Sequence, residues 1–418
     1  AKQDFFITDF GAEGDGISDC TNAIEKAVTA CHDAGGGRVV IPDGVFLTGA
    51  IHLKSNVNLH LTKNATLLFS TDPRQYLPVV YTRFEGVECM NYSPFIYAYE
   101  QENIAITGNG LLDGQAGEEN WWSWKGRKEF GWETGEPNGD NDTQRLNQMG
   151  ENQIPVPDRI FGEGSYLRPN FIQLYKCKNI LIDSVRIRRS PMWVIHPVLS
   201  ENVTVQNISV TSHGPNNDGC NPESSKNVLI KNSYFDTGDD CIAIKSGRNA
   251  DGRRVNVASE NIVVQGCTMK DGHGGVVIGS EVSGSCRNVF VENCVMDSPN
   301  LERALRIKTN SMRGGVVEHI YFNNVTVGEV SDAIVKINFN YGEGDVGQYD
   351  PIVRDVYVSN VTSRKSKFGI SIVGYERSPV SNINLENCRF EGVQDGNILK
   401  YYQDLRMKNV FINGQLQE

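Results

Sequence analysis

A short motif recurs along most of the chain and limits what it can fold into. The motif reads polar residue, Asn, apolar, any, apolar, any, and a turn-prone residue follows it. Copies are centred on Asn103, Asn179, Asn202, Asn227, Asn261, Asn288, His319, Asp355, Asn382 and Asn409, and from the second copy onward they lie 23 to 36 residues apart. Each copy predicts a short strand of alternating burial. Strand units of this period are typical of a solenoid, in which every coil buries its apolar side against its neighbours.

The segments between the motifs have little helical periodicity, so alternating strands and helices are not expected. We therefore predict an all-β fold, a right-handed parallel β-helix. A solenoid grows by adding coils, so its 418 residues do not require several domains, and we expect one domain over residues 1–418.

One amphipathic helix is predicted near the N-terminus. Ser18 and Asp19 can cap its start, and Gly35 to Gly37 end it. Its apolar face consists of Ala23, Ile24, Ala27, Val28 and Cys31. We expect this helix to cover the open end of the solenoid, with the first coils starting at strands near residues 39–41 and 56–61.

A large insertion, roughly residues 109–170, separates the first two motifs, which lie 76 residues apart. It contains four of the five tryptophans, Trp121, Trp122, Trp124 and Trp132, and three nearby cations, Lys125, Arg127 and Lys128. Two interpretations stay open. The insertion is a loop packed on the solenoid by its own aromatic rings, or a wall of a sugar-binding site, because aromatic faces stack on sugars, or both at once.

The charge balance excludes one class of partner. The chain has 40 basic and 51 acidic residues, a formal net charge of −11, which argues against a general nucleic-acid-binding surface. No run of 18 apolar residues or signal-peptide pattern is present, so we expect no membrane association. Three of the ten cysteines, Cys267, Cys294 and Cys388, follow the motif Asn by six residues, where other copies have apolar side chains. We expect free, buried thiols, and no metal site.

The candidate catalytic residues begin in the stretch 214–245. Asp218, Asp239 and Asp240 each lie beside a turn-forming Gly, Asn or Pro. Adjacent residues of a strand face opposite sides, so the Asp239–Asp240 pair can serve one cleft only where the backbone bends. His273, between two glycines, and the cations of Arg306-Ile307-Lys308 follow on later repeats. The repeat predicts that these groups converge on one wall.

These residues resemble glycoside hydrolase family 28, the polygalacturonase family, over nearly the whole chain. The resemblance rests on four elements in the family's order: Asn216-Asn217-Asp218-Gly219, Gly238-Asp239-Asp240-Cys241, Gly272-His273-Gly274 and Arg306-Ile307-Lys308. The opening Asp9-Phe10-Gly11, the Trp-Trp-x-Trp insertion and the run Glu302 to Ser311 are most similar to bacterial exo-acting polygalacturonases.

The resemblance implies hydrolysis of α-1,4-galacturonosyl linkages of pectin with inversion. Asp239 would be the general acid, Asp218 and Asp240 would share the attacking water, and His273 would orient Asp239. The implied substrate-binding residues are Asn216, Arg306, Lys308 and Tyr341, with Lys245 and Arg303 extending the cationic patch. No cofactor is implied, a pectic substrate is the expected partner of a monomer, and a secreted or periplasmic location is expected.

The mode of attack depends on the insertion. If residues 117–164 fold over the groove beside Asp218, the chain would be exo-acting from the nonreducing end. The alternatives are an endo-polygalacturonase or a rhamnogalacturonan-type hydrolase. Two further readings are a calcium-dependent pectate lyase, which the Asp-Asp and Gly-His-Gly elements argue against, and a noncatalytic polysaccharide-binding solenoid, which gives no reason for two Asp residues at a bend.

Overall fold

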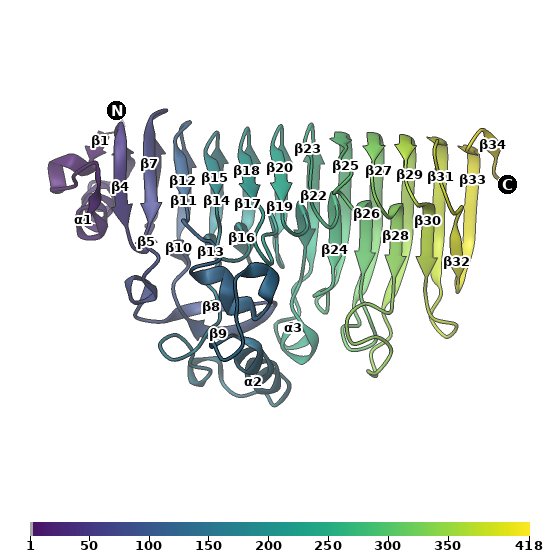
Figure 1. Cartoon of the computed structure of the whole chain (residues 1–418), viewed down its shortest axis with the longest axis horizontal. Coiled ribbons are helices and arrows are strands. Elements are labelled where there is room, and N and C mark those ends of the chain that lie inside the picture. Colours follow the sequence, from purple (N-terminus) through teal and green to yellow (C-terminus); the bar gives the residue numbers. More distant parts are fainter. Residues whose placement is uncertain (1–2) are drawn as a thin grey trace. The chain divides into compact units, whose positions relative to one another are not determined.

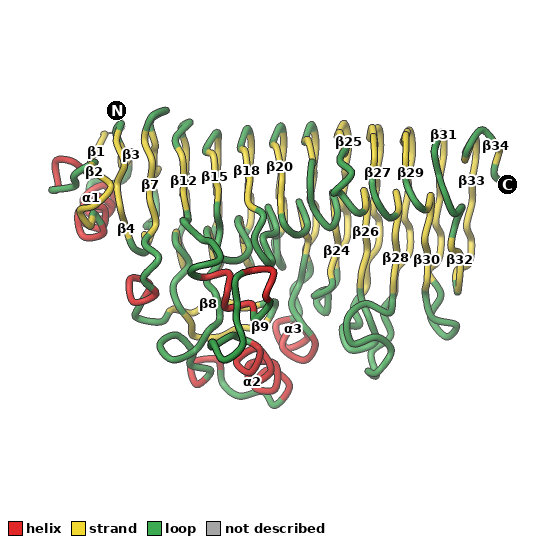
Figure 2. Tube along the Cα trace, viewed as in Figure 1, coloured by secondary structure: helices red, strands yellow, loops and turns green. Residues whose placement is uncertain are grey.

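Parallel strands, arranged coil by coil, make up most of the regular structure (Figure 1). The computed structural model describes residues 3–418, which divide into two units that meet in sequence between Asn217 and Asp218. Helices are few and short in both units (Figure 2). The predicted fold class, an all-β right-handed parallel β-helix, is confirmed.

The first unit contains two ladders of parallel strands and a third, smaller sheet. One ladder pairs β1 (Gln3–Phe6), β3 (Gly37–Ile41), β6 (Val57–Leu61), β11 (Glu102–Thr107), β14 (Lys178–Asp183) and β17 (Glu201–Gln206). The other pairs β2 (Asp15–Asp19), β4 (Gly44–Thr48), β7 (Ala65–Phe69), β12 (Leu111–Asp113), β15 (Arg186–Arg188) and β18 (Ser209–Ser212). The smaller sheet consists of β5 (Ile51–His52), β10 (Ile96–Tyr99), β13 (Ile172–Tyr175) and β16 (Ile195–Val198).

The second unit repeats this plan with longer strands. Its main ladder pairs β19 (Lys226–Lys231), β22 (Ser259–Gln265), β25 (Cys286–Met296), β27 (Val316–Glu329), β29 (Ile352–Lys365), β31 (Val380–Phe390) and β33 (Tyr402–Ile412). The short strands β20 (Tyr234–Thr237) and β23 (Thr268–Met269) join it, and β34 (Gln415–Leu416) closes it as an antiparallel hairpin. The facing sheet consists of β21 (Ile242–Ile244), β24 (Val276–Gly279), β26 (Arg303–Lys308), β28 (Ala333–Asn338), β30 (Phe368–Val373) and β32 (Ile398–Lys400). A short helix, α3 (Asn249–Val255), follows β21.

Strand register places equivalent repeat positions directly above one another. In the main ladder of the second unit one interior column is formed by Val228, Ile262, Val289, Ile320, Val356 and Ile383. All six are buried, as the alternating pattern predicts. The side chain of each coil therefore covers the one before it, and the core runs as stacked layers.

The motif asparagines adopt left-handed backbone conformations and hydrogen-bond from coil to coil. Asn261 has a φ of 59°. Its side-chain Nδ2 donates to Asn227 Oδ1 at 3.3 Å, and its Oδ1 accepts from Asn288 Nδ2 at 3.2 Å. Asn tolerates this conformation better than other residues with a side chain, and its amide can both donate and accept. The recurring Asn is thus explained by a bend that every coil repeats.

Helix α1 (Thr21–Asp33) packs on the first strands of the first unit, as expected for a capping helix. The five predicted apolar residues form its buried face. Two details of the prediction are wrong. The helix is preceded by Cys20 as its N-cap residue, with no side-chain cap, while Asp19 Oδ1 accepts from Thr21 N at 2.9 Å. The coils also begin earlier, because β1 precedes the helix and pairs with β3.

The insertion folds into a small subdomain of its own within the first unit. Helix α2 (Asp140–Glu151) packs on β9 of an antiparallel hairpin formed by β8 (Val80–Phe84) and β9 (Val87–Asn91). Its core includes Phe84, Leu146, Phe161 and Trp193. Neither element was predicted, because α2 has few apolar residues to reveal it. The short 3-10 helices of the first unit are η1 (Ile7–Phe10), η2 (Pro73–Tyr76), η3 (Trp121–Lys125), η4 (Lys128–Phe130) and η5 (Val156–Asp158).

Aromatic rings anchor the insertion. Trp121 is 1 % exposed, and its ring packs edge-on against Tyr76 and Trp124. Trp122 donates from Nε1 to the carbonyl oxygen of Ser190 at 2.8 Å. These contacts agree with the interpretation of a loop packed by its own aromatic rings.

The ten cysteines are all buried and free, as predicted for side chains that fill the interior as small apolar groups. Among residues 3–418, no helix is both long and apolar enough to cross a membrane.

Candidate active site

Asp218 is held next to the Asp239–Asp240 bend by backbone pairing within the second unit. The N–H of Gly219 donates to the carbonyl oxygen of Asp240 at 3.0 Å. A Cβ at Gly219 would lie 2.4 Å from the carbonyl oxygen of Cys241, so only glycine permits this approach. The predicted convergence of Asp218 with the later pair therefore depends on a glycine that follows it directly.

The bend at Asp239 and Asp240 lies immediately before β21. Thr237 Oγ1 donates to the carbonyl oxygen of Asp239 at 2.8 Å, and the N–H of Asp240 donates to Asp239 Oδ1 at 2.8 Å. These two bonds fix the turn, so both carboxylates serve one site. Asp240 is fully buried and Asp218 is 3 % exposed.

His273 reaches this bend from the next coil. Its backbone N–H donates to the carbonyl oxygen of Asp239 at 3.0 Å, and its Nδ1 lies 3.1 Å from Asp239 Oδ1. Side-chain ligand atoms of Asp239, Asp240 and His273 all lie within 4.8 Å of one another. The His273 side chain is 48 % exposed, so the ring forms an open edge of the site.

Arg306 and Lys308 lie two positions apart on β26, so their side chains share one face of the strand. Lys308 Nζ lies 3.1 Å from Asp240 Oδ2 in a buried ion pair. Arg306 is 7 % exposed, yet its guanidinium makes no hydrogen bond or ion pair with any residue that the structure describes. The ring of Tyr341 lies near both cations, with its centroid 4.7 Å from Lys308 Nζ and 5.3 Å from Arg306 Cζ.

The environments of Asp218 and Asp239 move their pKa values in opposite directions. Burial and the nearby charges of Asp239 and Asp240 raise the pKa of Asp218 well above its ordinary value. Burial also acts to raise the pKa of Asp239, but the hydrogen bond and charge of His273 and the charge of Lys308 outweigh it, and the net pKa is lowered. Of these two carboxyl groups, Asp218 therefore binds a proton more tightly than Asp239.

His273 carries the proton that Asp239 lacks. Its hydrogen bond to Asp239 raises the pKa of the imidazole above the ordinary value of 6.5, against the opposing effect of burial. Asp239 and His273 thus form a hydrogen-bonded pair, 3.1 Å apart, in which the imidazole binds a proton more tightly than the carboxyl group.

Two other predicted substrate residues have protein partners. Lys245 is 3 % exposed, donates to the carbonyl oxygen of Gly279 at 2.8 Å and pairs with Glu281 Oε2 at 3.2 Å. Arg303 pairs with Asp332 Oδ2 at 2.8 Å. Their direct contact with a substrate stays a prediction.

Asn216 lies near the end of the first unit, just before its boundary with the second. Its φ is 56°, and its Oδ1 accepts from Arg168 at 2.7 Å. Arg168 is 3 % exposed and also donates to the carbonyl oxygens of Pro191 and Pro215. The side chain of Asn216 is thereby held in one orientation by an element of the insertion region.

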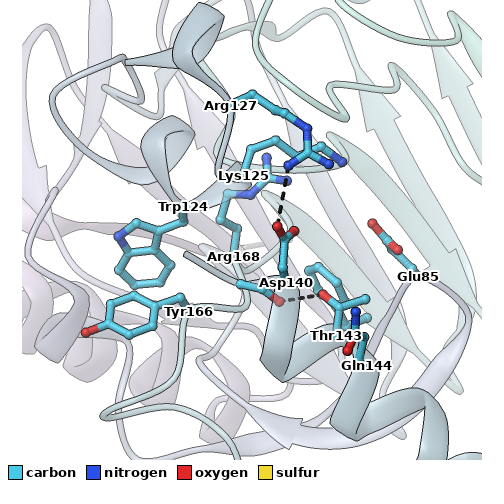
Figure 3. A pocket seen from close by; sticks show the side chains of 11 residues that line it. Glu85, Trp124, Lys125, Arg127, Asp140, Thr143, Gln144, Tyr166 and Arg168 are labelled. Carbon is cyan, nitrogen blue, oxygen red and sulfur yellow. Dashed lines mark hydrogen bonds and ion pairs between the residues drawn. The ribbon is translucent and has the colours of Figure 1, made fainter. Parts of the chain in front are cut away.

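A cavity of about 340 Å³ lies in the insertion (Figure 3). Figure 3 shows the Trp124 and Tyr166 rings side by side, with centroids 5.1 Å apart, and Arg127 facing Asp140 at 3.5 Å. Lys125 also lines it, and its ammonium has no ion-pair partner among residues 3–418. The lining residues are Phe84, Glu85, Trp124, Lys125, Arg127, Gly139, Asp140, Thr143, Gln144, Tyr166 and Arg168. Aromatic rings with cations suit an acidic sugar, the second of the two interpretations of the insertion.

Comparison with known proteins identifies the family. The model of glycosyl hydrolases family 28 matches residues 162–408, which include the carboxylates, His273 and both cations of β26. The chain belongs to glycosyl hydrolases family 28. A second model, named rhamnogalacturonase A/epimerase, pectate lyase-like, matches residues 5–62.

Relatives of this family 28 chain include enzymes of plants and bacteria. A "probable polygalacturonase" of Vitis vinifera is 30 % identical over 91 % of this chain and 73 % of the relative. The exo-poly-alpha-D-galacturonosidase of Dickeya chrysanthemi is 30 % identical over 94 % of this chain and 68 % of the relative. The crystal structure of an exopolygalacturonase from Thermotoga maritima matches with a TM-score of 0.97 at 49 % identity, covering 99 % of this chain and 93 % of that one.

Sequence reasoning missed the polar contacts that support the family 28 site. Asn221 donates to Asp218 Oδ2 at 2.8 Å, and Glu281 partners Lys245. Arg313 is buried and pairs with Glu343 at 2.8 Å. Asn221 lies three positions after Asp218, so its contact with Asp218 could have been predicted from this spacing. The other two pairs join residues 30 or more positions apart, which a single sequence does not connect.

Proposed function

We propose that this chain hydrolyses α-1,4-galacturonosyl linkages of polygalacturonate with inversion, acting from the nonreducing end and releasing galacturonate. The observation that carries the proposal is Arg306. Its buried guanidinium has no counter-ion among the described residues, although it lies by Tyr341 and Lys308. A buried cation without a partner is costly unless a ligand supplies the anion. Galacturonate differs from a neutral sugar by such a carboxylate, and charge-assisted bonds to it would satisfy Arg306.

Asp239 is the proposed general acid, acting together with His273. An inverting glycosidase needs one group that gives a proton to the leaving oxygen. The Asp239–His273 pair holds a mobile proton, and transfer from Nδ1 to Oδ1 regenerates the acid form of Asp239. His273 in this way stores the proton that Asp239 delivers.

Asp240 is the proposed general base. Its Oδ2 pairs with Lys308, whereas its buried Oδ1 accepts from no donor among the described residues. That oxygen is available to a water molecule poised for attack on the opposite face of the sugar. Asp218, whose pKa is raised by burial and which Asn221 orients, would hydrogen-bond the same water.

The ion pair at Asp240 also favours hydrolysis over a calcium-dependent lyase. Lys308 supplies a positive charge 3.1 Å from Asp240 Oδ2, and a calcium ion at the same carboxylate would be repelled by it. The positive charge next to this carboxylate therefore comes from the side chain of Lys308.

Exo action is supported by two observations. The Dickeya and Thermotoga relatives are named as exo-acting enzymes. The insertion has a cavity lined by Trp124, Lys125 and Arg127, which suits a terminal uronate. Lys128, also considered from sequence, is exposed on η4 and does not line the cavity.

Product analysis tests the proposal. On polygalacturonate, monogalacturonate should be the first product, with an inverted anomeric configuration seen by proton NMR and little early fall in viscosity. Rapid viscosity loss with mixed oligomers would instead show endo action. An unsaturated, ultraviolet-absorbing product would identify a lyase. If no new reducing ends form, the protein binds the polymer without cleaving it.

We also propose a secreted or periplasmic location and a monomeric state. The polymer substrate is too large and too charged to cross a membrane, so an enzyme that degrades it must meet it outside the cytoplasm. No other partner is required by the proposed reaction.

A further inference from the structure

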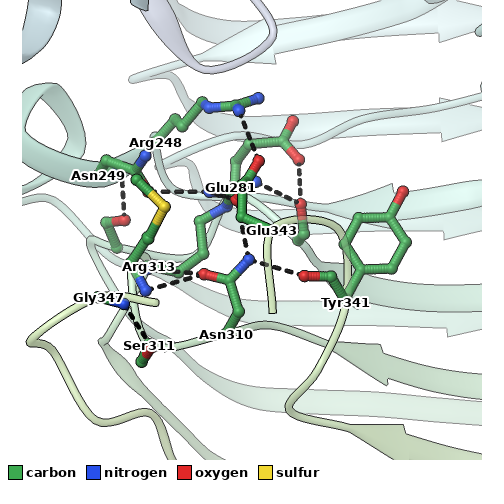
Figure 4. Close-up of polar contacts among 12 residues, drawn as sticks. Arg248, Asn249, Glu281, Asn310, Ser311, Arg313, Tyr341, Glu343 and Gly347 are labelled. Carbon is green, nitrogen blue, oxygen red and sulfur yellow. Dashed lines mark hydrogen bonds and ion pairs between the residues drawn. The ribbon is translucent and has the colours of Figure 1, made fainter. Parts of the chain in front are cut away.

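The loop between β28 and β29 carries Tyr341, and the carboxylate of Glu343 binds the part of the loop next to this tyrosine. Figure 4 shows Glu343 among three donors of the second unit. Glu343 Oε1 accepts from Arg248 at 2.9 Å. Glu343 Oε2 accepts from Arg313 at 2.8 Å and from Asn310 at 2.9 Å.

Arg313 is a rigid anchor for this contact. It is 2 % exposed, and besides Glu343 it donates to Asn249 Oδ1 at 2.9 Å and to Ser280 Oγ at 3.3 Å. Partners on two segments other than the loop fix its guanidinium, so it can hold the loop in place rather than follow it.

Asn310 links Glu343 to Tyr341 directly. The same Nδ2 group that donates to Glu343 also donates to the carbonyl oxygen of Tyr341 at 2.8 Å. The N–H of Tyr341 donates to the carbonyl oxygen of Thr309 at 3.2 Å. The backbone of Tyr341 is thus set by the residues that hold Glu343.

The loop would not stay ordered by its own chemistry. Gly342 and Gly344 flank Glu343 with φ values of 59° and 73°, and glycine loses much conformational freedom when it is ordered. The other ties lie further along the loop. The ion pair of Asp345 with Arg377 at 2.6 Å is exposed on both sides and screened by solvent, and the N–H groups of Gly347 and Tyr349 donate to Ser311 at 2.8 and 2.7 Å.

We propose that Glu343 is a positioning residue, whose carboxylate, bound by Arg248, Arg313 and Asn310, keeps the Tyr341 ring beside Arg306 and Lys308, ready for the substrate. This role rests on the proposed function of the site. A preordered Tyr341 spares the substrate the entropy of ordering the loop, so the loss of Glu343 weakens binding more than it slows the chemical step.

The first test compares Glu343→Gln with Asp345→Asn, a matched loss of one carboxylate two residues away. For a defined oligogalacturonide we expect KM to rise about tenfold in Glu343→Gln, with kcat within about threefold, and both constants to stay within about twofold in Asp345→Asn. An unchanged KM in Glu343→Gln, or an equal rise in both variants, would overturn the proposal.

A double-mutant cycle separates positioning from general destabilisation. If Glu343 acts through Tyr341, adding Glu343→Gln to Tyr341→Ala leaves KM unchanged relative to Tyr341→Ala alone. A further tenfold rise in that background would show that Glu343 acts elsewhere and would refute the role.

Hydrogen exchange tests, independently of activity, whether Glu343 orders the loop. The amides of residues 340–350 should exchange faster in Glu343→Gln than in the unmodified chain and in Asp345→Asn, while the amides of β26 keep their protection. Equal exchange in all three proteins would overturn the proposal. A chain inactive on polygalacturonate would refute the proposed function, while this exchange experiment would still decide the role of Glu343.

Discussion

Asp218 and Asp239 are the same residue type in the same site, yet their surroundings move their pKa values in opposite directions. Asp218 is buried and lies near two other carboxylates, so its pKa is raised. Asp239 has His273 as its partner, and its pKa is lowered despite burial. Acid–base catalysis requires surroundings that separate the pKa values of two carboxyl groups. Here the acid function of Asp239 also depends on the proton held by His273.

Asp239→Asn tests the assignment of the acid. The amide keeps the shape of the side chain but cannot deliver a proton, so we expect kcat to fall by about 10²- to 10⁴-fold with KM within a few-fold. Steady-state kinetics on an oligogalacturonide measure both, with Asp297→Asn, an exposed carboxylate paired with Arg364, as the control. A kcat within a few-fold of the unmodified chain would contradict the assignment.

The pH profile tests the role of His273. Its raised pKa keeps the imidazole protonated above pH 6.5, so the Asp239–His273 pair should lose its proton, and the enzyme its activity, only at higher pH. We expect the alkaline limb of kcat/KM to lie above pH 6.5 and to move to lower pH in His273→Gln. A limb at the same pH in both proteins would show that another group supplies the proton.

Arg306→Ala tests the proposed uronate contact. We expect a KM for oligogalacturonate about 10- to 100-fold higher, because a charge-assisted bond to the sugar carboxylate is lost. Arg354→Ala, which removes an exposed arginine paired with Glu318, is the control. An unchanged Michaelis constant in Arg306→Ala would argue against the contact.

For single residues, the sequence predicted which side chains lie close together in the second unit, because four short motifs identified them. It did not predict the pKa order of the carboxylates, which depends on burial and on the contact of His273 with Asp239. It considered Arg313 only as a possible member of the cationic patch and did not connect it with Glu343, because each is an ordinary charged residue until its partner is known.

The strands and their turns were the most predictable elements. A repeated Asn followed by alternating apolar residues reveals a bend and the strand after it, and the structure has both. The hairpin β8–β9 and helix α2 were not predicted because they pack against each other outside the repeat. Their sequences lack a strong periodic pattern, and tertiary contacts decide their structure.

Asn261 provides a test of the bend. Asn261→Ala loses two side-chain hydrogen bonds and strains a left-handed backbone, for a loss in unfolding free energy of about 2–4 kcal/mol. Asn261→Gly loses the hydrogen bonds but relieves the strain, and its loss should be about 1–2 kcal/mol. Urea unfolding measures both, and equal losses would mean that the backbone conformation contributes nothing.

At the scale of the whole molecule, Glu281 is a clear case of a buried charge held by ion pairs. Its pKa is lowered from 4.5 to about 2, because the charges of Lys245 and Arg313 outweigh the effect of burial. A lowered pKa in the folded state means that the ionised carboxylate stabilises the fold fully above pH 4.5. This contribution is lost as the pH falls toward 2.

Glu281→Gln should therefore destabilise the protein by about 3 kcal/mol at neutral pH, with the difference from the unmodified chain shrinking between pH 4.5 and pH 2. Thermal or urea unfolding over this range measures it. Glu386→Gln, which removes an exposed partner of Lys408, should change stability by less than about 1 kcal/mol at any pH. A difference for Glu281→Gln that does not depend on pH would contradict the ion-pair explanation.

The strand order of the facing sheet limits how this protein can change through evolution. Asp240 lies just before β21 and its partner Lys308 on β26, two strands further along the sheet. Duplication of the coil that contains β24 would shift Lys308 by one strand spacing, about 4.8 Å, and break the 3.1 Å pair. A coil duplicated beyond β30 would leave that distance untouched. The second unit can therefore gain coils toward its C-terminal end during evolution, while the number of coils from β21 to β26 has to stay constant to keep this ion pair.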